Sequence, residues 1–387
     1  MKNSASRFLT THVGSLARPV SLLDIMTEKE HGRPYDSDAF EAEVAKAVHD
    51  IVAKQAECGI DVVTDGEMGK VDFFTYVRDR LGGFETRDPD GPGFMPESWK
   101  LEAAAFPEYY ERYFKKYTKS VSPLRKMFCT GPVSYEGTAE LQRDLANLRA
   151  AADAAGAEEA FLPATSPYGF GDNEFYDREE DYVAAVGEAL RVEYKAIVDA
   201  GFILQVDDPW LIELLQHDPT RTAAERRKAA ERHVEGMNYA LRGIPQDKVR
   251  YHICYGLNAG PRVHDAPMKD FVDLMLQVNA CGYSFEVANP RHQHEWRLWE
   301  DFELPDDKML IPGFISHSIP FIEHPEGVAE QVINYAKLVG RERVIVGADC
   351  GFSSRASYSP ELPPNIVWAK FQALAEGAAL ASGRHGG

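Results

Sequence analysis

The chain has 387 residues, of which 44% are hydrophobic and 27% charged, and its formal net charge is −19. These proportions are typical of a soluble globular protein, and the length suits a single α/β barrel domain covering residues 1–387. The acidic balance argues against nucleic acid or an anionic membrane surface as a partner, because both require a basic face.

The sequence also indicates where the protein works. No apolar run approaches the ~20 residues that a membrane-spanning helix requires, and residues 1–7 lack the apolar core of a signal peptide. Five dispersed cysteines, an odd number, do not resemble a disulfide framework. We therefore expect a cytoplasmic protein without a membrane partner. A homo-oligomer is compatible with the sequence.

Short β-rich runs alternate with longer amphipathic segments along the chain. The predicted strands cover residues 10–15, 60–67, 126–132, 160–167, 203–209, 249–256, 283–287, 309–317 and 344–351, and the predicted helices cover 37–58, 139–155, 181–200, 223–242, 268–281 and 325–338. Such alternation predicts a parallel sheet. No G-x-G-x-x-G fingerprint follows the first strand, which favours a (β/α)8 TIM barrel over a doubly wound sheet. A barrel seats eight of the nine strands, and we exclude 160–167 because it carries two prolines.

Residues 84–122 interrupt the alternation after the second predicted strand. They begin with a turn-rich stretch, residues 87–94, and continue with aromatic residues at nearly helical spacing: Trp99, Phe106, Tyr109, Tyr110, Tyr113, Phe114 and Tyr117. This pattern predicts an inserted subdomain or a lid over a binding site. A helix that packs its aromatic residues on the core is an equally compatible interpretation.

Polar residues end nearly every predicted strand, and in barrels the chemistry gathers at those carboxyl ends. His252 and Cys254 lie two apart on one strand, so their side chains point to the same side. With Glu286 and Cys350 from two later strands, they supply one imidazole, two thiolates and one carboxylate. Such mixed ligation suits Zn²⁺ better than Mg²⁺ or Ca²⁺, which prefer oxygen ligands alone. A buried cysteine beside a core histidine is the simpler alternative for an isolated H-x-C.

The motifs, taken as an ordered set, resemble those of the cobalamin-independent methionine synthase family. The resemblance extends from about residue 8 to residue 357, and it rests on Val13-Gly14-Ser15, Asp65-Gly66-Glu67, Thr130-Gly131-Pro132-Val133, Gln205-Val206-Asp207-Asp208-Pro209, His252-x-Cys254, Ser316-His317-Ser318 and Asp349-Cys350-Gly351 followed by Arg355. Each motif is weak alone, but their shared order is specific.

This resemblance implies a UROD/MetE-like barrel and a residue for each role. Zn²⁺ would be held by His252, Cys254, Glu286 and Cys350. The backbone of Ser15 and the carboxylates of Glu67 and Asp207 would bind homocysteine, with the carboxylates on its ammonium group. His317 would donate a proton to the leaving group. The reaction would be attack of a zinc-bound thiolate on a methyl or alkyl donor to form a thioether.

The chain departs from the family in two respects. The full-length family enzyme is a double barrel about twice this long, and this chain matches only its catalytic half. The folate-binding Arg-Cys pair and Trp have no clear counterpart, and residues 161–170 occupy that region instead. The methyl or alkyl donor, whether folate, a corrinoid protein or another molecule, therefore stays open.

Three other functions compete with this one. An epoxide-opening coenzyme M transferase would need an arginine for the sulfonate, for which Arg18 and Arg355 are candidates. A uroporphyrinogen-type decarboxylase would share the barrel but requires no metal. A non-catalytic protein with a structural zinc fits poorly, since such sites usually use short local loops.

Several further residues have a simpler reading. We expect His292 and His294 to be solvent-exposed rather than rival ligands, and Cys58, Cys129 and Cys281 to be core thiols. Asp349 is read either as an acceptor behind the metal ligands or as a cap of its strand end.

Overall fold

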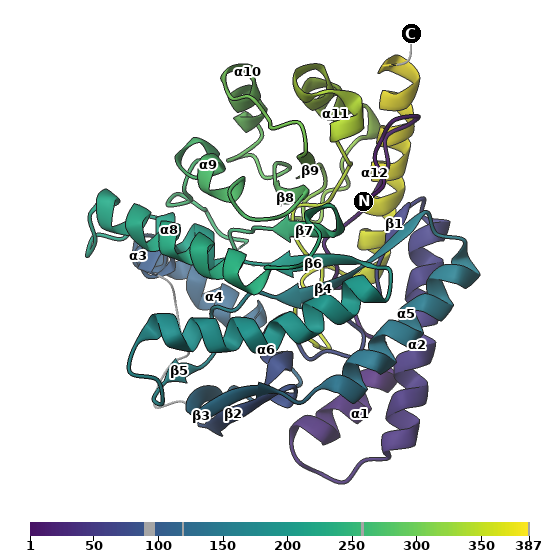
Figure 1. The fold of residues 1–387 in the computed structure, drawn as a ribbon. Helices are drawn as coiled ribbons and strands as arrows, with labels where there is room; N and C mark the ends of the chain where they lie inside the picture. Colours follow the sequence, from purple (N-terminus) through teal and green to yellow (C-terminus); the bar gives the residue numbers. More distant parts are fainter. Residues whose placement is uncertain (89–96, 118–119, 257–258, 386–387) are drawn as a thin grey trace.

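The computed structural model describes residues 1–88, 97–117, 120–256 and 259–385. Six strands form one parallel sheet in the order β1-β4-β6-β7-β8-β9, with helices around it (Figure 1). The strands are β1 (Val62–Val63), β4 (Glu159–Thr165), β6 (Ile203–Asp207), β7 (Val249–His252), β8 (Gly282–Glu286) and β9 (Met309–Gly313). All residues of the last four strands are buried, as expected for a sheet covered on both faces.

Two short segments extend the sheet at its edges through single parallel bridges. Residues 344–347 bridge to β9 through Leu310↔Val344 and Gly313↔Gly347. Residues 10–11 bridge both to this segment, through Thr10↔Val346, and to β1, through Thr11↔Val62. The sheet is therefore curled, and its architecture is consistent with the predicted TIM barrel.

The larger helices lie on the outside of this sheet (Figure 1). They are α1 (Val20–Glu30), α2 (Ser37–Glu57), α5 (Thr138–Ala155), α6 (Glu179–Asp199), α8 (Ala223–Ala240), α11 (Pro325–Val339) and α12 (Pro364–His385), and the shorter ones are α7 (Trp210–Leu215), α9 (Val272–Met275) and α10 (Leu298–Asp301). Their starts follow local chemistry: the Asp36 carboxylate accepts backbone N–H groups at the start of α2, and Thr222 forms a capping box with Glu225 at the start of α8. None of the described helices has both the length and the apolar character needed to cross a membrane.

The structure corrects the predicted choice of strands. Residues 160–167, which the prediction excluded, supply most of β4, a strand between β1 and β6. The proline is tolerated because β1 pairs only with Glu159 and Ala160, so Pro163 lies beyond that ladder and breaks none of its hydrogen bonds. Residues 126–132 do form a strand, but it belongs to a separate sheet.

That second sheet consists of β2 (Leu81–Arg87), β3 (Lys126–Tyr135) and β5 (Asp172–Asn173). β2 and β3 pair antiparallel and lie below the six-stranded sheet in Figure 1. Between them the chain forms α3 (Glu97–Ala105) and α4 (Pro107–Tyr117). The predicted turn cluster at residues 87–94 lies mostly outside the described residues. A lid role for residues 84–122 stays a prediction.

α3 and α4 contact the loop that follows β7. Tyr109 donates its hydroxyl to the carbonyl of Ala259 over 2.6 Å, and the Glu102 carboxylate accepts the backbone N–H of Val263. A Cβ placed on Gly256 would lie 3.2 Å from the Trp99 ring, so this ring is directly against the loop. The aromatic helices therefore support the segment that follows Cys254.

A buried ion cluster attaches β2 to the helices around the sheet. The Arg80 guanidinium pairs with Glu193 of α6 at 3.0 Å and with Asp144 of α5, and all three side chains are nearly inaccessible. Glu193 also accepts hydrogen bonds from the hydroxyls of Tyr76 and Tyr135. Loss of one partner from such a cluster leaves a buried charge uncompensated.

We expect Arg80→Ala to lower the free energy of unfolding by about 3–5 kcal/mol, because it leaves the buried Glu193 carboxylate without its cation and Asp144 with Arg143 alone. Urea denaturation followed by circular dichroism measures this change. Arg87→Ala is the matched control, since Arg87 ends the strand that begins directly after Arg80 but forms an exposed ion pair with Glu174. The two variants should differ clearly, and equal midpoints would contradict the anchoring role of Arg80.

Candidate functional site

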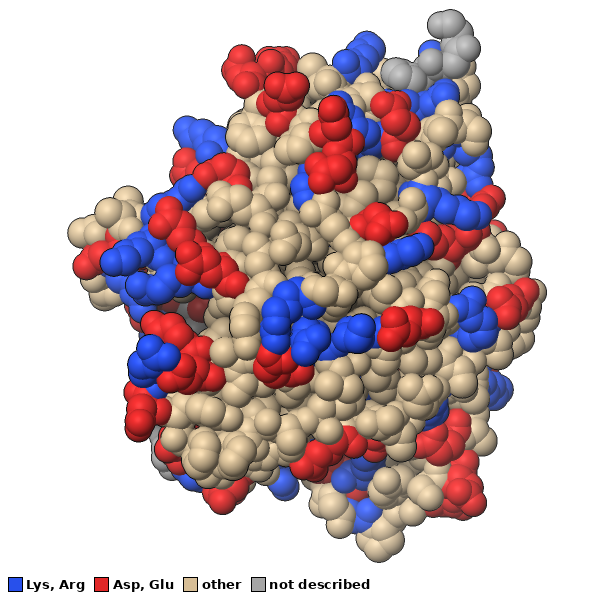
Figure 2. Space-filling model, in the orientation of Figure 1, with Lys and Arg blue, Asp and Glu red and all other residues tan. Residues whose placement is uncertain are grey.

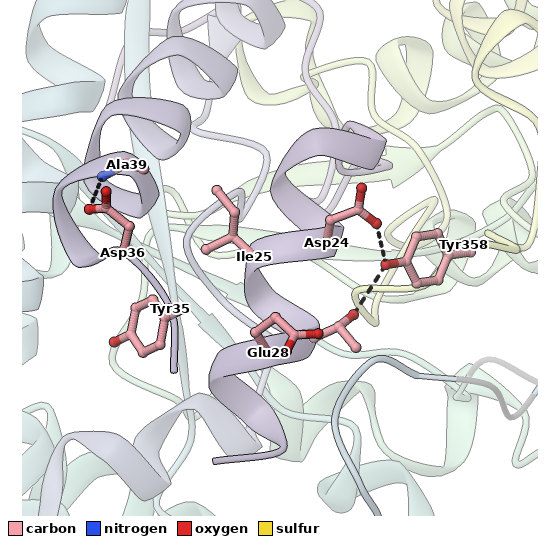
Figure 3. A pocket seen from close by; sticks show the side chains of 8 residues that line it. Asp24, Ile25, Glu28, Tyr35, Asp36, Ala39 and Tyr358 are labelled. Carbon is pink, nitrogen blue, oxygen red and sulfur yellow. Dashed lines mark hydrogen bonds between the residues drawn. The ribbon is translucent and has the colours of Figure 1, made fainter. Parts of the chain in front are cut away.

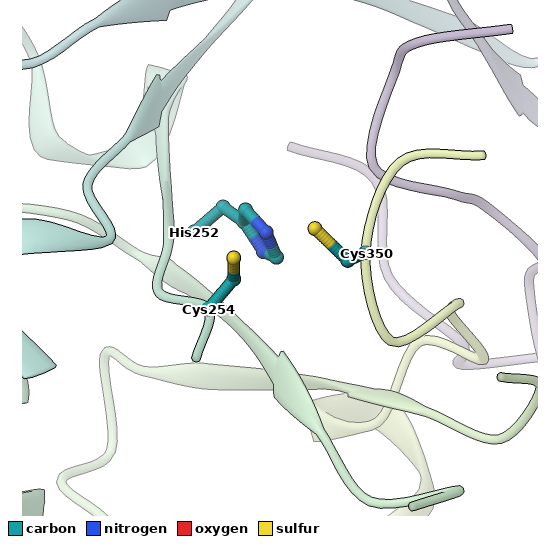
Figure 4. Close-up of side chains that lie close together, drawn as sticks. All are labelled: His252, Cys254 and Cys350. Carbon is teal, nitrogen blue, oxygen red and sulfur yellow. The ribbon is translucent and has the colours of Figure 1, made fainter. Parts of the chain in front are cut away.

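Three predicted metal ligands come together at the carboxyl edge of the sheet. β7 ends at His252, Cys254 follows two residues later, and Cys350 comes from the loop after residues 344–347. The side chains point toward one another (Figure 4), and their ligand atoms all lie within 4.8 Å of each other. All three residues are buried. Residues separated by almost one hundred positions thus form one compact cluster.

The chemistry of this cluster fits a metal ion. His252 Nδ1 is hydrogen-bonded to Ser284 Oγ at 3.0 Å, and its buried Nε2 has no hydrogen-bond partner among the described residues. A histidine ligand typically binds metal with one nitrogen while the other is held by such a partner. Burial, together with the charge of Arg250, lowers the pKa of His252 to about 3, so the imidazole is neutral, as metal ligation requires.

The two thiols are also placed as a pair of ligands. The hydrogen bond between the Cys350 and Cys254 thiols, followed by burial, raises the pKa of Cys350 well above its usual value. The backbone N–H of Gly256 donates to Cys254 Sγ at 3.1 Å. Two adjacent thiols and one free imidazole nitrogen form a soft donor set of the kind that binds transition-metal ions.

Glu286, the fourth predicted ligand, belongs to a second buried cluster with His317 and Asp349, whose ligand atoms lie within 4.8 Å of one another. One Glu286 oxygen accepts the N–H of Tyr255 at 3.2 Å, and Arg262 pairs with the carboxylate at 3.2 Å. Burial would raise the pKa of Glu286, but the Arg262 charge, together with His317, His292 and the Tyr255 N–H, outweighs burial and holds the pKa below its usual value. Glu286 is thus a carboxylate, and its ligand role stays a prediction.

His317 and Asp349 face this second cluster with unused polar atoms. Within the described ranges, neither ring nitrogen of His317 and only one Asp349 oxygen, Oδ1, has a hydrogen-bond partner. Oδ1 accepts the N–H groups of Val287 and Ala288, which is the capping role considered from the sequence. Burial lowers the pKa of His317 to about 4, so its imidazole is neutral at physiological pH.

Glu67 and Asp207 form a pair of buried carboxylates near the same edge. Burial raises the pKa of Glu67 to about 7, and burial together with the Glu67 charge raises the pKa of Asp207 well above its usual value. Gln205 donates to Asp207 at 2.7 Å, whereas the adjacent Asp208 is held by His233 and Tyr251. Two carboxylates that oppose each other's ionisation are well suited to bind a cationic group between them.

The backbone of Glu67 is in an unusual conformation. Its φ of 59° makes it one of two residues other than glycine with positive φ in the described part of the chain. Such strain costs on the order of 1–3 kcal/mol and persists mainly at functional sites. The Asp65 carboxylate accepts the Glu67 N–H, and Arg18 lies 3.7 Å from its side chain. The strain therefore supports a functional role for the Glu67 carboxylate.

Ser15 contacts the loop that carries Cys350. Its carbonyl accepts the N–H of Phe352 at 3.0 Å. A Cβ added to Gly351 would lie 2.0 Å from Ser15 Oγ and 3.3 Å from Ser15 Cβ, so a larger residue beside Cys350 would have to displace the Ser15 side chain. The two motifs that contain Ser15 and Cys350 are thus in direct contact.

Comparison with known proteins finds relatives of this chain. No protein family model matches the chain. A methionine synthase of Sulfolobus acidocaldarius is 24% identical over 346 residues, which cover 88% of this chain and 85% of the relative. A methionine synthase of Saccharolobus islandicus is 24% identical over 374 residues, with 95% and 93% covered. The B12-independent methionine synthase from Shewanella sp. W3-18-1, solved with selenomethionine, superposes with a TM-score of 0.74 at 18% identity, covering 98% and 99%.

The chain is a homologue of the methionine synthases. The resemblance predicted from the ordered motifs is confirmed, and it extends over nearly the whole chain. The relatives are named methionine synthases, which supports the predicted methyltransferase class. The match spans most of the length of the relatives as well, 93% of the Saccharolobus islandicus protein.

Other predicted residues lie elsewhere. The prediction that His292 is solvent-exposed is wrong, because it is buried, bonded to Asp265 and Glu295, and stacked on Tyr255 at 4.2 Å. His294 is exposed, as predicted. Cys58 and Cys129 are buried, and Cys281 is half-buried. Arg262 was missed, because a lone arginine after Gly260-Pro261 carries no motif.

Two cavities lie apart from the clusters. The first, about 390 Å³, lies between α1 and α2, where the Asp24 carboxylate accepts from Tyr358 and Asp36 caps a helix (Figure 3). The second, about 540 Å³, is lined by residues of three segments: Asp72, Phe74, Thr75, Arg78, Ser120, Ser122, Pro123, Leu124, Arg125, Arg355, Ser357, Tyr358 and Ser359.

Charged residues of both signs are interspersed on the face shown in Figure 2.

We expect Gly351→Ala to reduce metal affinity at least about tenfold, because its methyl group would push the Cys350 loop away from Ser15. Competition with a chromophoric chelator measures the change. Gly327→Ala on α11 is the control, since a Cβ at that position meets no atom within 4 Å. Wild-type affinity in Gly351→Ala would show that this close contact does not position the ligand.

The raised pKa of Glu67 predicts a pH dependence of stability. Between pH 4.5 and about 7 the folded chain keeps a proton on Glu67 that the unfolded chain loses, so this residue lowers the free energy of unfolding as pH rises. Glu67→Gln should remove the effect, and its stability relative to wild type should improve by up to about 3 kcal/mol across that range. Urea denaturation at several pH values measures it.

Asp208→Asn is a control of opposite sign. Burial would raise the pKa of Asp208, but the charge of His233 outweighs it and keeps the pKa below its usual value. The stability that this carboxylate contributes is present at neutral pH and lost as pH falls through the lowered pKa. The loss of unfolding free energy in Asp208→Asn relative to wild type should therefore become smaller in acid. A stability difference between Glu67→Gln and wild type that does not change with pH would contradict the raised pKa of Glu67.

Proposed function

We propose that the chain is a zinc-dependent thiol methyltransferase of the methionine synthase type, with homocysteine as the thiol and a closed (β/α)8 barrel as the scaffold. The observation that carries this proposal is the convergence of His252, Cys254 and Cys350 beside two buried carboxylates. A metal alone would not require Glu67 and Asp207, and an ammonium-bearing substrate explains them. The full-length homology to methionine synthases supports the same function.

Zinc fits the donor set because two thiolates and one imidazole are its usual ligands in proteins. Bound zinc would supply a deprotonated, still nucleophilic substrate thiolate, whereas a free thiol is mostly protonated at neutral pH. His252, Cys254 and Cys350 would hold the metal, and Glu286 would be the fourth ligand that loosens when substrate arrives, since carboxylate is the harder partner for zinc.

The remaining residues bind substrate and move protons. Glu67 and Asp207 would bind the ammonium group of homocysteine, whose positive charge relieves their mutual repulsion. The Ser15 backbone would position the amino-acid end. His317, with both ring nitrogens unpartnered within the described chain, would give a proton to the leaving group. Residues 84–122 would cover the bound donor.

The structure weakens the coenzyme M alternative. Arg18 already donates to the carbonyls of Leu16, Lys70 and Ser353 and pairs with Glu67, so its guanidinium is occupied. Only Arg355, on the wall of the 540 Å³ cavity, stays as a candidate for the sulfonate. The metal-free decarboxylase leaves the two adjacent thiols without a role.

Zinc analysis combined with homocysteine titration tests the proposal. We expect stoichiometric zinc in the wild type, with proton release on adding homocysteine, because thiolate ligation expels the thiol proton. Cys254→Ser should lose the zinc, and Cys129→Ser, which removes a buried thiol of β3, should keep it.

The other outcomes are also informative. Zinc without a response to homocysteine would point to another thiol, with coenzyme M tested first. A wild-type protein that binds no zinc after reconstitution would overturn the proposed function.

A further inference from the structure

We propose that Arg262 is a positioning residue that receives the Glu286 carboxylate when Glu286 leaves the metal, and so opens the fourth ligand position to the substrate thiol. This inference rests on the proposed function and assigns a role to a residue outside the predicted ligand set. The Arg262 and Glu286 side chains are 4% and 0% exposed and lie 3.2 Å apart, so water does not screen their attraction.

Glu286 lies between the metal-binding loop and Arg262. It is two residues after Ser284 on β8, so both side chains point to the same side of the sheet, and Ser284 holds His252 in place. Glu286 also accepts the N–H of Tyr255, the residue after Cys254. The carboxylate is therefore attached to the metal-binding loop on one side and to Arg262 on the other.

Charge balance explains why an arginine is needed there. Two cysteinates neutralise Zn²⁺, Glu286 brings the site to −1, and a substrate thiolate would bring it to −2 if Glu286 stayed bound. If Glu286 released the metal as the substrate thiolate bound, with the thiol proton passing to solvent, the site would keep its charge of −1. The released carboxylate is buried, and without a cation it would be an uncompensated charge.

The conformation of Arg262 shows that its place is strongly constrained. Its φ of 59° is the second positive value found outside glycine in the described residues. Asp265 accepts from Arg262 Nε at 2.8 Å, and His292 fixes Asp265 at 3.1 Å. A strained backbone persists only where the surrounding contacts maintain it. Here we infer that these contacts direct the guanidinium of Arg262 toward Glu286.

The aromatic helices hold the same loop from outside. Glu102 of α3 accepts the N–H of Val263, the residue after Arg262, and also the hydroxyl of Tyr110 on α4. Tyr109 donates to Ala259 three residues before Arg262. The helices of the region 84–122 thus contribute to the position of Arg262, which gives them a defined link to the metal site.

A double-mutant cycle between Arg262 and Glu286 tests this role on the full-length, zinc-loaded protein. Arg262→Gln should bind zinc about tenfold more tightly and homocysteine about tenfold more weakly, because Glu286 then has the metal as its one strong partner. Chelator competition gives the zinc affinity, and calorimetric titration gives the homocysteine affinity. In a Glu286→Gln background the same arginine substitution should change neither value.

X-ray absorption at the zinc edge adds a structural readout. Saturating homocysteine should replace an oxygen ligand by sulfur in the wild type, and the oxygen should persist in Arg262→Gln. Arg262→Lys keeps the charge but loses the two-pronged geometry of the guanidinium. The extent to which sulfur replaces oxygen in this variant should therefore lie between wild type and Arg262→Gln, and Arg262→Lys replaces Arg262→Gln in the test if the latter fails to fold. Arg297→Gln, at an exposed arginine, is the control and should match wild type.

The outcomes separate this inference from the function on which it rests. A wild type without zinc or homocysteine binding would overturn the proposed function. Wild-type binding together with an unchanged homocysteine affinity in Arg262→Gln, or an equal loss in the Glu286→Gln background, would overturn the role of Arg262 alone.

Discussion

The register between β6, β7 and β8 is the constraint on which the site depends. Asp207 is paired with His252 across β6 and β7, and His252 is paired with Ser284 across β7 and β8. This row brings the Asp207 carboxylate, the His252 imidazole and the Ser284 hydroxyl to one level of the sheet. A shift of one residue in any of these pairs would turn its side chains to the other face, and the cluster would not form.

Burial of charge is the second organising feature. Several buried carboxylates lie at the edge of the sheet, and a different group compensates the negative charge of each. Glu67 is near Arg18, Glu286 is paired with Arg262, and Asp208 is paired with His233. Among the described residues, the side chain of Asp207 accepts from the neutral amide of Gln205, and that of Asp349 accepts from backbone N–H groups. Incompletely compensated carboxylates are costly in a folded protein, and cationic ligands would offset that cost.

The homology and the geometry support the proposed function in different ways. The methionine synthase relatives cover almost the whole chain but share only about a quarter of its residues. The geometry identifies which of the shared motifs meet: the loops of Ser15 and Cys350 touch, and His252, Cys254 and Cys350 converge. The methyl donor is the part of the reaction for which neither provides a residue set, and the cavity beside Arg355 is open to it.

The sequence by itself determined the alternation of strands and helices, the barrel class and the identity of the candidate ligands. These follow from local periodicity and from ordered motifs, which do not depend on distant contacts. It could not place β4, because the tolerance of Pro163 depends on where the β1 ladder ends. The burial of His292 was also missed. This residue has two acidic partners: Asp265, 27 residues earlier in the chain, and Glu295, three residues after His292.

Only the tertiary structure brought Glu286 and Arg262 together. Arg262 is 24 residues before Glu286 in the chain, and no periodic pattern links them. Their contact arises because a loop held by α3 and α4 folds over the carboxyl end of β8. Electrostatic partners of this kind are set by three-dimensional proximity and by the exclusion of water, and both appear only when the chain is folded.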